Sequence, residues 1–150
     1  MKSKILSIFN ETKKKSIRVG VVGYSDKKFD KGVALELLCD SFDEATKGYR
    51  DITIVSGLTD LGIPALAYKE ALARKWGTVG IACKKASEFK CFDCDEIVMI
   101  GEEWGDESEK FLDSIDVLIR IGGGKQSIAE VKKAKEMGIK AIEHELEEIK

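Results

Sequence analysis

Residues 119–131, Ile119-Arg120-Ile121-Gly122-Gly123-Gly124-Lys125-Gln126-Ser127-Ile128-Ala129-Glu130-Val131, decide the fold that we predict for this chain. The apolar residues around Arg120 are typical of a buried strand, and the residues from Ser127 onward have helical spacing. Glycine lets a backbone approach a ligand closely, and the free N–H groups of a first helical turn attract anions. A tight turn without a ligand is the alternative, but it does not require three consecutive glycines. The stretch therefore predicts a phosphate site formed by Gly122, Gly123, Gly124, Lys125, Gln126 and Ser127. In this site, the Ser127 hydroxyl either caps the helix or binds a phosphate oxygen.

The rest of the chain alternates short apolar runs with helical patterns. Strands are expected at residues 17–23, 52–55, 78–82, 97–100, 117–121 and 139–142, and helices near 31–48, 62–75, 105–113 and 127–137. Short apolar strands separated by helices are typical of parallel β-α-β units with right-handed crossovers. We therefore expect an α/β chain with a three-layer Rossmann-like fold and a mostly parallel, doubly wound sheet of about six strands. Residues 1–15 are expected to form an amphipathic N-terminal helix, and residues 16–150 a single domain.

The composition excludes several classes of protein. With 43% hydrophobic and 35% charged residues, the chain has the balance of a soluble globular domain. Lys and Arg number 25 and Asp and Glu number 27, so there is no overall basic field, and nucleic-acid binding is not expected. No run is apolar enough to span a membrane, and the N-terminus lacks the features of a signal peptide. These features predict a cytoplasmic protein without a membrane partner.

Two further loops follow predicted strands. In an open parallel sheet, ligands bind beyond the carboxyl ends of the strands, where the strand order reverses. After the first strand, Gly23 permits close approach, Ser25 can reach an anion, and Tyr24 stacks on a base or packs in the core. The loop after the second strand offers Ser56, Gly57, Thr59 and Asp60, and the last two of these are suited to bind a sugar or to cap the next helix. No loop contains GxGxxG or GxxxxGK[ST], so a standard dinucleotide or triphosphate site is not predicted.

The cysteines are spaced unevenly and are expected to be reduced thiols. Cys91 and Cys94 have the CxxC spacing with which zinc and redox sites bring two thiolates together. A zinc site needs about four ligands, and His144, the only histidine, lies far away in the sequence. We therefore predict no metal site and regard Cys91 and Cys94 as weak candidates only.

The two glycine loops resemble those of the SLOG superfamily, a Rossmann-like group that includes the LONELY GUY phosphoribohydrolases and the molybdenum-cofactor carrier proteins. The superfamily signature PGGxGTxxE corresponds to residues 122–130, where two glycines and Glu130 are kept and Ser127 replaces the threonine. Gly122 takes the proline position and Gln126 a glycine position. The earlier GGGxxG loop corresponds to residues 57–62, in which only the outer glycines remain. The resemblance extends over residues 17–142 and implies a nucleotide-like ligand whose phosphate lies on residues 122–127.

In the hydrolase members of that superfamily, the glutamate of the motif acts with an arginine on the preceding helix to cleave the N-glycosidic bond of a nucleoside 5′-monophosphate. The resemblance implies that Glu130 is this catalytic glutamate, one turn past Ser127 and facing the ribose. The arginine is not found, because residues 102–111 are acidic and contain Lys110 as their only cation. Arg120 is a substitute only if the strand points it toward the ligand. Without a cation, the electrostatic stabilisation of the transition state is incomplete.

We therefore predict a protein that binds a phosphorylated small molecule, either a nucleotide or a molybdopterin-type (pterin cofactor) ligand, and that requires no other cofactor. The first alternative is a nucleoside 5′-monophosphate phosphoribohydrolase with Glu130 as its acidic residue. The second is an interaction module, in which residues 1–15 and the acidic residues 143–148 form subunit contacts. A homo-oligomer, a dimer or a tetramer, is expected. His144 is expected to be solvated and without a role, Trp76 to lie in the core, and Trp104 to form a wall of the ligand pocket.

Overall fold

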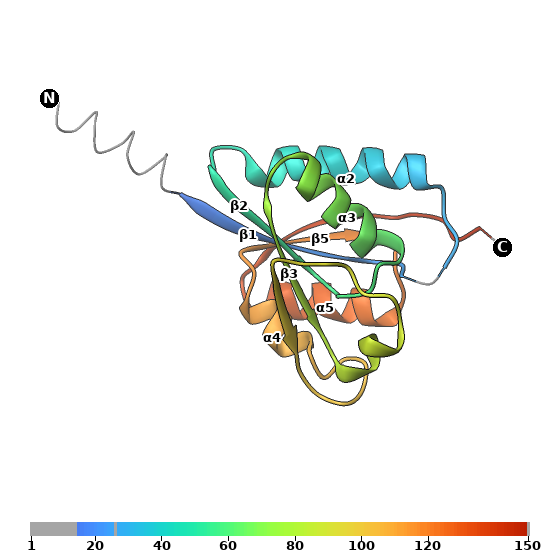
Figure 1. The fold of residues 1–150 in the computed structure, drawn as a ribbon. Coiled ribbons are helices and arrows are strands. Elements are labelled where there is room, and N and C mark those ends of the chain that lie inside the picture. The colour runs from blue at the N-terminus through green and yellow to red at the C-terminus, as the bar shows by residue number, and fades with distance from the viewer. Residues whose placement is uncertain (1–14, 26, 150) are drawn as a thin grey trace, which may run out of the picture.

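The computed structural model describes residues 15–25 and 27–149, in which strands and helices alternate along the chain (Figure 1). The strands are β1 (Ser16–Gly23), β2 (Asp51–Ser56), β3 (Gly77–Ala82), β4 (Glu96–Met99), β5 (Val117–Ile121) and β6 (Lys140–His144). The helices are α2 (Lys31–Thr46), α3 (Gly62–Ala73), α4 (Ser108–Asp113) and α5 (Lys125–Glu136), with a short 3-10 helix η1 (Lys84–Glu88). The amphipathic helix predicted for residues 1–15 lies, apart from Lys15, outside the described residues. None of the described helices is both long enough and apolar enough to cross a membrane.

The strands form one sheet of order β4-β3-β2-β1-β5-β6, and every pairing between them is parallel. From β1 the chain moves outward through β2 and β3 to β4, and then crosses back to β5 on the other side of β1. The strand order therefore reverses between β1 and β5, whose register pairs Val21 with Ile119 and Gly23 with Ile121. The predicted doubly wound sheet is confirmed. Its switch point lies between the two strands that lead into Gly23 and Gly122.

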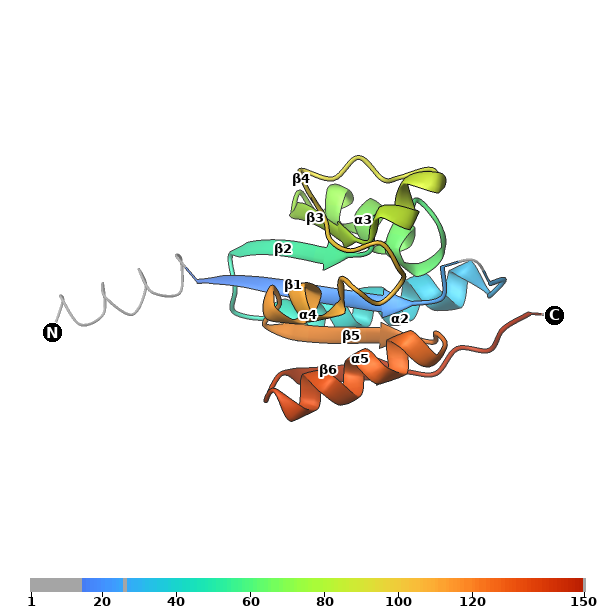
Figure 2. The same ribbon diagram turned by 90° about the horizontal axis from the view of Figure 1, so that it is seen from below.

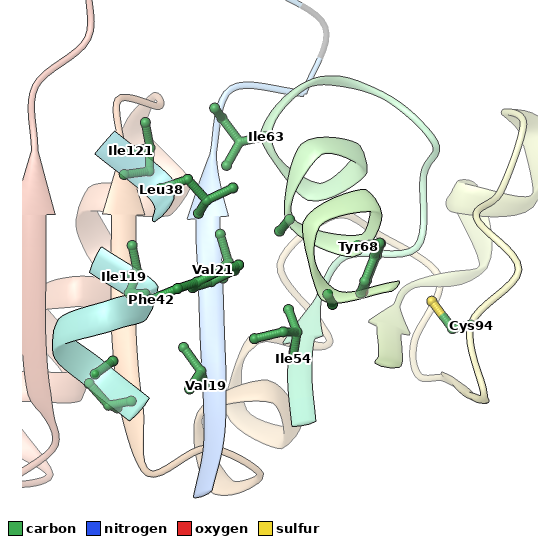
Figure 3. Close-up of a cluster of buried hydrophobic side chains, with 14 of the residues drawn as sticks. Val19, Val21, Leu38, Phe42, Ile54, Ile63, Tyr68, Cys94, Ile119 and Ile121 are labelled. Carbon is green, nitrogen blue, oxygen red and sulfur yellow. The ribbon is translucent and has the colours of Figure 1, made fainter. Parts of the chain in front are cut away.

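Helices cover both faces of the sheet, which makes three layers (Figure 2). On one face, α2 and α3 cover a cluster in which Leu38 and Phe42 pack with Ile119 (Figure 3). On the other face, α4 and α5 cover a second cluster, in which Phe111 packs with Leu118. Because side chains alternate along a strand, Leu118 and Ile119 enter different cores. This two-sided burial explains why the strands are continuous apolar runs in the sequence.

Two helices begin without the side-chain cap that the sequence suggested. Helix α5 begins at Lys125 with Gly124 as its N-cap, and no side chain caps it. Ser127 is therefore inside the first turn and does not cap the helix, contrary to one of its two predicted roles. Helix α3 has Leu61 at its N-cap, again without a side-chain cap, so Asp60 does not cap it. The Ile63 N–H donates instead to the Tyr24 carbonyl at 2.7 Å, which shows that a neighbouring loop and not a capping side chain fixes this helix start.

Candidate functional site

A cavity of about 480 Å³ opens beside the switch point, where the central strands end. The loops after β1, β2 and β5 all contribute to its wall. Of the residues predicted from the sequence, those that line it are Gly23, Tyr24, Ser25, Ser56, Gly57, Thr59, Trp104, Gly123, Gly124, Lys125, Gln126, Ser127 and Glu130. Gly122 and Asp60 do not line it. The fold thus gathers three loops around a space of the size that small ligands occupy.

The glycine loop after β5 has a backbone that only glycine adopts without strain. Gly122 has φ +63° and Gly123 has φ +102°. A Cβ on Gly123 would lie 2.6 Å from the Ser127 hydroxyl oxygen, whereas a Cβ on Gly124 would meet nothing within 4 Å. Gly124 therefore faces open space at the N-cap of α5. The loop leaves room for a ligand directly in front of the first helical turn.

This end of the cavity is suited to an anion. The N–H groups of the first turn of α5 have no intrahelical acceptor, and they carry the positive end of the helix dipole. No side chain caps the helix, so these donors are uncovered, and residues 124–127 line the cavity. Lys27 and Lys125 are the basic residues among the described residues that line the cavity. Both side chains are exposed, so they attract an anion without the cost of burying a charge.

In the loop after β2, hydrogen bonds within the protein occupy two polar groups of residues that line the cavity. The Ser56 hydroxyl is buried and donates to the Val21 carbonyl at 2.6 Å, which joins β2 to β1. The Tyr68 hydroxyl donates to the Gly57 carbonyl at 2.7 Å and so holds this loop against α3. Asp60 lies away from the cavity, 3.4 Å from the Lys90 ammonium. Thr59 is therefore the side chain of this loop that remains for the predicted sugar contact.

Sequence reasoning missed one buried acid, Glu107, which lies in the cavity wall beside Glu130. Glu107 is 7% exposed and Glu130 is 8% exposed. The Gln126 side-chain amide donates to Glu107 Oε1 at 3.1 Å, and the Ser108 hydroxyl donates to Glu130 Oε2 at 3.0 Å. Glu107 follows β4 at the same edge of the sheet as the glycine loops, and this position in the sequence could have indicated that it lies at the site.

The pKa of Glu130 is raised to about 7, chiefly by burial and to a smaller extent by the nearby charge of Glu107. The hydrogen bond from the Ser108 hydroxyl works against this shift, since it favours the charged form. The Glu130 carboxyl is therefore partly protonated at neutral pH. A carboxyl in this state can donate a proton to a ligand or accept one from it.

The acidic segment before α4 repels an anion in the cavity less strongly than its composition suggests. Residues 102–107 precede the helix rather than forming part of it, and Glu107 alone among their glutamates lines the cavity. Glu102 is paired with Lys84 at 2.8 Å, and Glu103 is paired with Lys85. These two exposed pairs direct the negative charge toward η1 and away from the cavity.

Arg120 does not replace the arginine that the hydrolases use. Its side chain is 5% exposed and does not line the cavity. The guanidinium donates to Glu143 Oε1 at 3.0 Å, to Glu145, and to the Gly122 carbonyl at 2.9 Å. Arg120 therefore ties the glycine loop to β6 and to the segment that follows it. Glu143 and Glu145, two of the acidic residues that we expected at a subunit contact, thus pair with Arg120 within the chain.

The two tryptophans have different surroundings. Trp76 is half-buried and packs edge-on against Phe42, with ring centroids 5.3 Å apart, which agrees with the predicted core position. Trp104 lines the cavity, as predicted, although it is 48% exposed. Its closest aromatic neighbour is Phe89, at 6.1 Å between ring centroids.

The CxxC pair lies in the first core cluster and not at the cavity. Burial raises the pKa of the Cys94 thiol to about 11, so the thiolate that zinc requires is disfavoured. The Cys91 thiol lies 3.3 Å from the Ala86 carbonyl. Within residues 15–25 and 27–149, no group of three or more His, Cys, Asp and Glu side chains is arranged to hold a metal ion.

The parallel sheet, its switch point and the glycine loops together define a Rossmann-like α/β protein with a small-ligand cavity. No family model matches the sequence, and no curated protein matches it. Among solved structures, the chain is similar to the molybdenum cofactor carrier protein from Chlamydomonas reinhardtii, with 21% identity, a TM-score of 0.68, and coverage of 86% of this chain and 76% of that one. It is also similar to the structural-genomics target TM1055, with 21% identity, a TM-score of 0.64, and coverage of 83% and 72%. Both likenesses establish the fold, and the carrier belongs to one of the groups that the glycine motifs resemble.

Proposed function

We propose that this protein binds a phosphorylated, nucleotide-derived small molecule, a nucleotide or a pterin cofactor, with the ligand phosphate on residues 123–127. The observation that carries the proposal is the glycine loop. Gly123 has a positive φ, Gly124 faces open space, and the uncapped first residues of α5 line the same cavity. Such a loop at a switch point is a general solution for phosphate binding.

The resemblance of the glycine motifs to the SLOG superfamily supports the same proposal. One structural neighbour is a molybdenum cofactor carrier protein, and a carrier needs a binding cavity but no complete catalytic set. The described cavity wall has this character, since its basic residues are Lys27 and Lys125 and it contains no arginine. We place the chain in the SLOG superfamily as a proposal that rests on motif and fold together.

Isothermal titration calorimetry with AMP, GMP and ribose 5-phosphate tests the binding proposal. Lys125→Ala is expected to weaken binding of each phosphate about 3- to 30-fold, because a charge-assisted contact contributes up to about 2 kcal/mol. Lys132→Ala is the matched control, since Lys132 is exposed on the same helix and does not line the cavity. Absence of binding by the unaltered protein at millimolar ligand would rule the proposal out.

A phosphoribohydrolase is the second candidate function, and the buried carboxyl pair favours it. Glu130, with its pKa of about 7, would donate a proton to the departing base, while the Glu107 carboxylate stabilises positive charge on the sugar. Water would then add to the anomeric carbon and lose a proton, giving the free base and ribose 5-phosphate. Binding remains the better proposal, because no arginine lines the described part of the cavity.

Chromatographic detection of free base from AMP or GMP tests this second function. Glu130→Gln keeps the shape of the side chain but removes its proton transfer, so any base release should fall about 100-fold or more. Glu136→Gln, on the exposed surface of α5, is the control and should leave the rate unchanged. An equal rate in the Glu130→Gln variant would show that Glu130 is not catalytic.

A further inference from the structure

We infer that Trp104 is the binding platform for a planar aromatic heterocycle, the base or pterin ring of the ligand. This inference rests on the proposed function and adds to it the part of the cavity that recognises the ring. It concerns a residue outside both glycine loops, on the segment between β4 and α4.

The first observation is the exposure of a large aromatic side chain inside a cavity wall. Trp104 is 48% exposed although it lines the cavity. Phe89 packs near it with ring centroids 6.1 Å apart and planes inclined by 53°. Phe89 therefore supports the indole without covering it by parallel stacking. A planar ring stacked on the indole would remove its open apolar surface from water.

The second observation is that contacts within the protein hold the segment that carries the indole in place. Asp106 accepts hydrogen bonds from the backbone N–H groups of Glu102 and Glu103, each at 3.0 Å. The Gly105 N–H donates to Glu107 Oε2 at 3.1 Å. The Lys84–Glu102 ion pair at 2.8 Å joins the same segment to η1. A fixed aromatic platform binds a ring at a smaller entropic cost than a mobile side chain does.

The third observation is the set of chemical groups that the cavity wall brings together. The proposed phosphate site, residues 123–127, is joined to the acidic part of the wall by the 3.1 Å hydrogen bond from Gln126 to Glu107. Glu107 in turn lies three residues from Trp104 on one short segment. Carboxylate oxygens accept hydrogen bonds from hydroxyl groups. The wall therefore offers a phosphate site, hydroxyl acceptors and an aromatic plane, which are the groups that can bind the phosphate, sugar and base of a nucleotide.

The test compares phosphates with and without an aromatic ring in calorimetric titrations of the full chain. The probes are GMP, AMP and ribose 5-phosphate, and the variants are Trp104→Ala and Trp104→Leu. A base stacked on an aromatic side chain should tighten binding at least about fivefold. We expect the nucleotides to bind more tightly than ribose 5-phosphate by this factor, and we expect both variants to abolish the difference while ribose 5-phosphate affinity stays unchanged.

Fluorescence gives an independent readout. In a Trp76→Phe background, the emission comes from Trp104 alone, since the chain has two tryptophans. Trp76 does not line the cavity, so this change should leave affinity unaltered. Stacking of GMP or AMP should quench Trp104 emission, and ribose 5-phosphate should not.

Each outcome bears on the inference. Equal affinities for the nucleotides and for ribose 5-phosphate would overturn the role of Trp104 while leaving phosphate binding intact. A preference for nucleotides that persists in Trp104→Ala would do the same. Failure of every phosphate to bind the unaltered protein would overturn the proposed function and this inference together.

Discussion

At the scale of single residues, Gly123 and Gly124 are adjacent but have different structural roles. Gly123 has a positive φ and no room for a Cβ, whereas Gly124 has φ −98° and open space in front of it. Gly123→Ala should therefore lower the free energy of unfolding by about 1–3 kcal/mol through backbone strain and contact with Ser127. Gly124→Ala should cost under about 1 kcal/mol of stability yet weaken phosphate binding, because its methyl group enters the ligand space.

Urea denaturation and calorimetric titration separate these two effects. The informative result is a reversal of rank, in which Gly123→Ala is the less stable variant and Gly124→Ala is a stable variant with impaired binding. If Gly124→Ala binds GMP as the unaltered chain does, the phosphate does not lie at the N-cap of α5.

Glu130 makes stability depend on pH. Burial raises its pKa from the ordinary value of 4.5 to about 7. Between these values the folded chain retains a proton that the unfolded chain has lost, so the free energy of unfolding falls as the pH rises. The full loss, reached above pH 7, is up to about 3 kcal/mol for a shift of this size. Glu130→Gln should therefore flatten the pH dependence and be more stable than the unaltered chain at pH 8.

Urea denaturation at several pH values from 5 to 8 checks this prediction. Glu136→Gln provides the comparison, because that side chain is exposed on the same helix and should leave the slope unchanged. An identical slope in the Glu130→Gln variant would mean that the Glu130 carboxyl is not the group that titrates.

At the scale of secondary-structure elements, one buried arginine couples β5, β6 and the glycine loop. Arg120→Met would leave the Gly122 carbonyl without its donor and Glu143 without one of its two cations. We expect the free energy of unfolding to fall by about 1–3 kcal/mol. The loss is limited because Glu145 is exposed and regains water when its pair with Arg120 is broken. Phosphate affinity should fall as well, because Gly122, whose carbonyl Arg120 holds, directly precedes the proposed phosphate-binding residues 123–127.

Lys135→Met is a matched control for Arg120→Met, because both cations bind the same Glu143 carboxylate. The Lys135–Glu143 pair lies 2.9 Å apart but the lysine is 58% exposed. Exposed pairs contribute only about 0–1 kcal/mol. Thermal denaturation should therefore show a much smaller effect for Lys135→Met, and equal effects would contradict the role that we assign to burial of Arg120.

Element boundaries show where sequence patterns were sufficient. Strands buried on both faces, such as β1 and β5, were predicted nearly to the residue because two apolar cores require a continuous apolar run. The start of α5 was placed too late. Ser127 looked like a capping residue, but the positive φ angles at Gly122 and Gly123 turn the chain early, so that helical geometry begins at Lys125.

At the scale of the whole molecule, the state of assembly is a prediction. The amphipathic pattern of residues 1–15 suggests a surface that packs on another subunit, and we expect a dimer or a tetramer. Size-exclusion chromatography with light scattering should give a smaller assembly for a chain that begins at residue 16 than for the full chain. An oligomer of unchanged size would show that this segment is not needed for assembly.

The sequence by itself determined the α/β class, the order of strands and helices, and the three loops that lead from strands toward the cavity. It could do so because apolar periodicity and glycine conformation are local properties of the chain. The loops meet because the carboxyl ends of parallel strands share one edge of a sheet.

Only the tertiary structure decided what each polar side chain near that edge does. Arg120 is buried against Glu143, and Glu107 is brought beside Glu130, through contacts between segments that are far apart in the chain. Burial then raises the pKa of Glu130, and the neighbours of Trp104 determine how much of its indole ring is exposed. Charge, burial and exposure are properties of the surroundings of a residue, and those surroundings exist only once the sheet has formed.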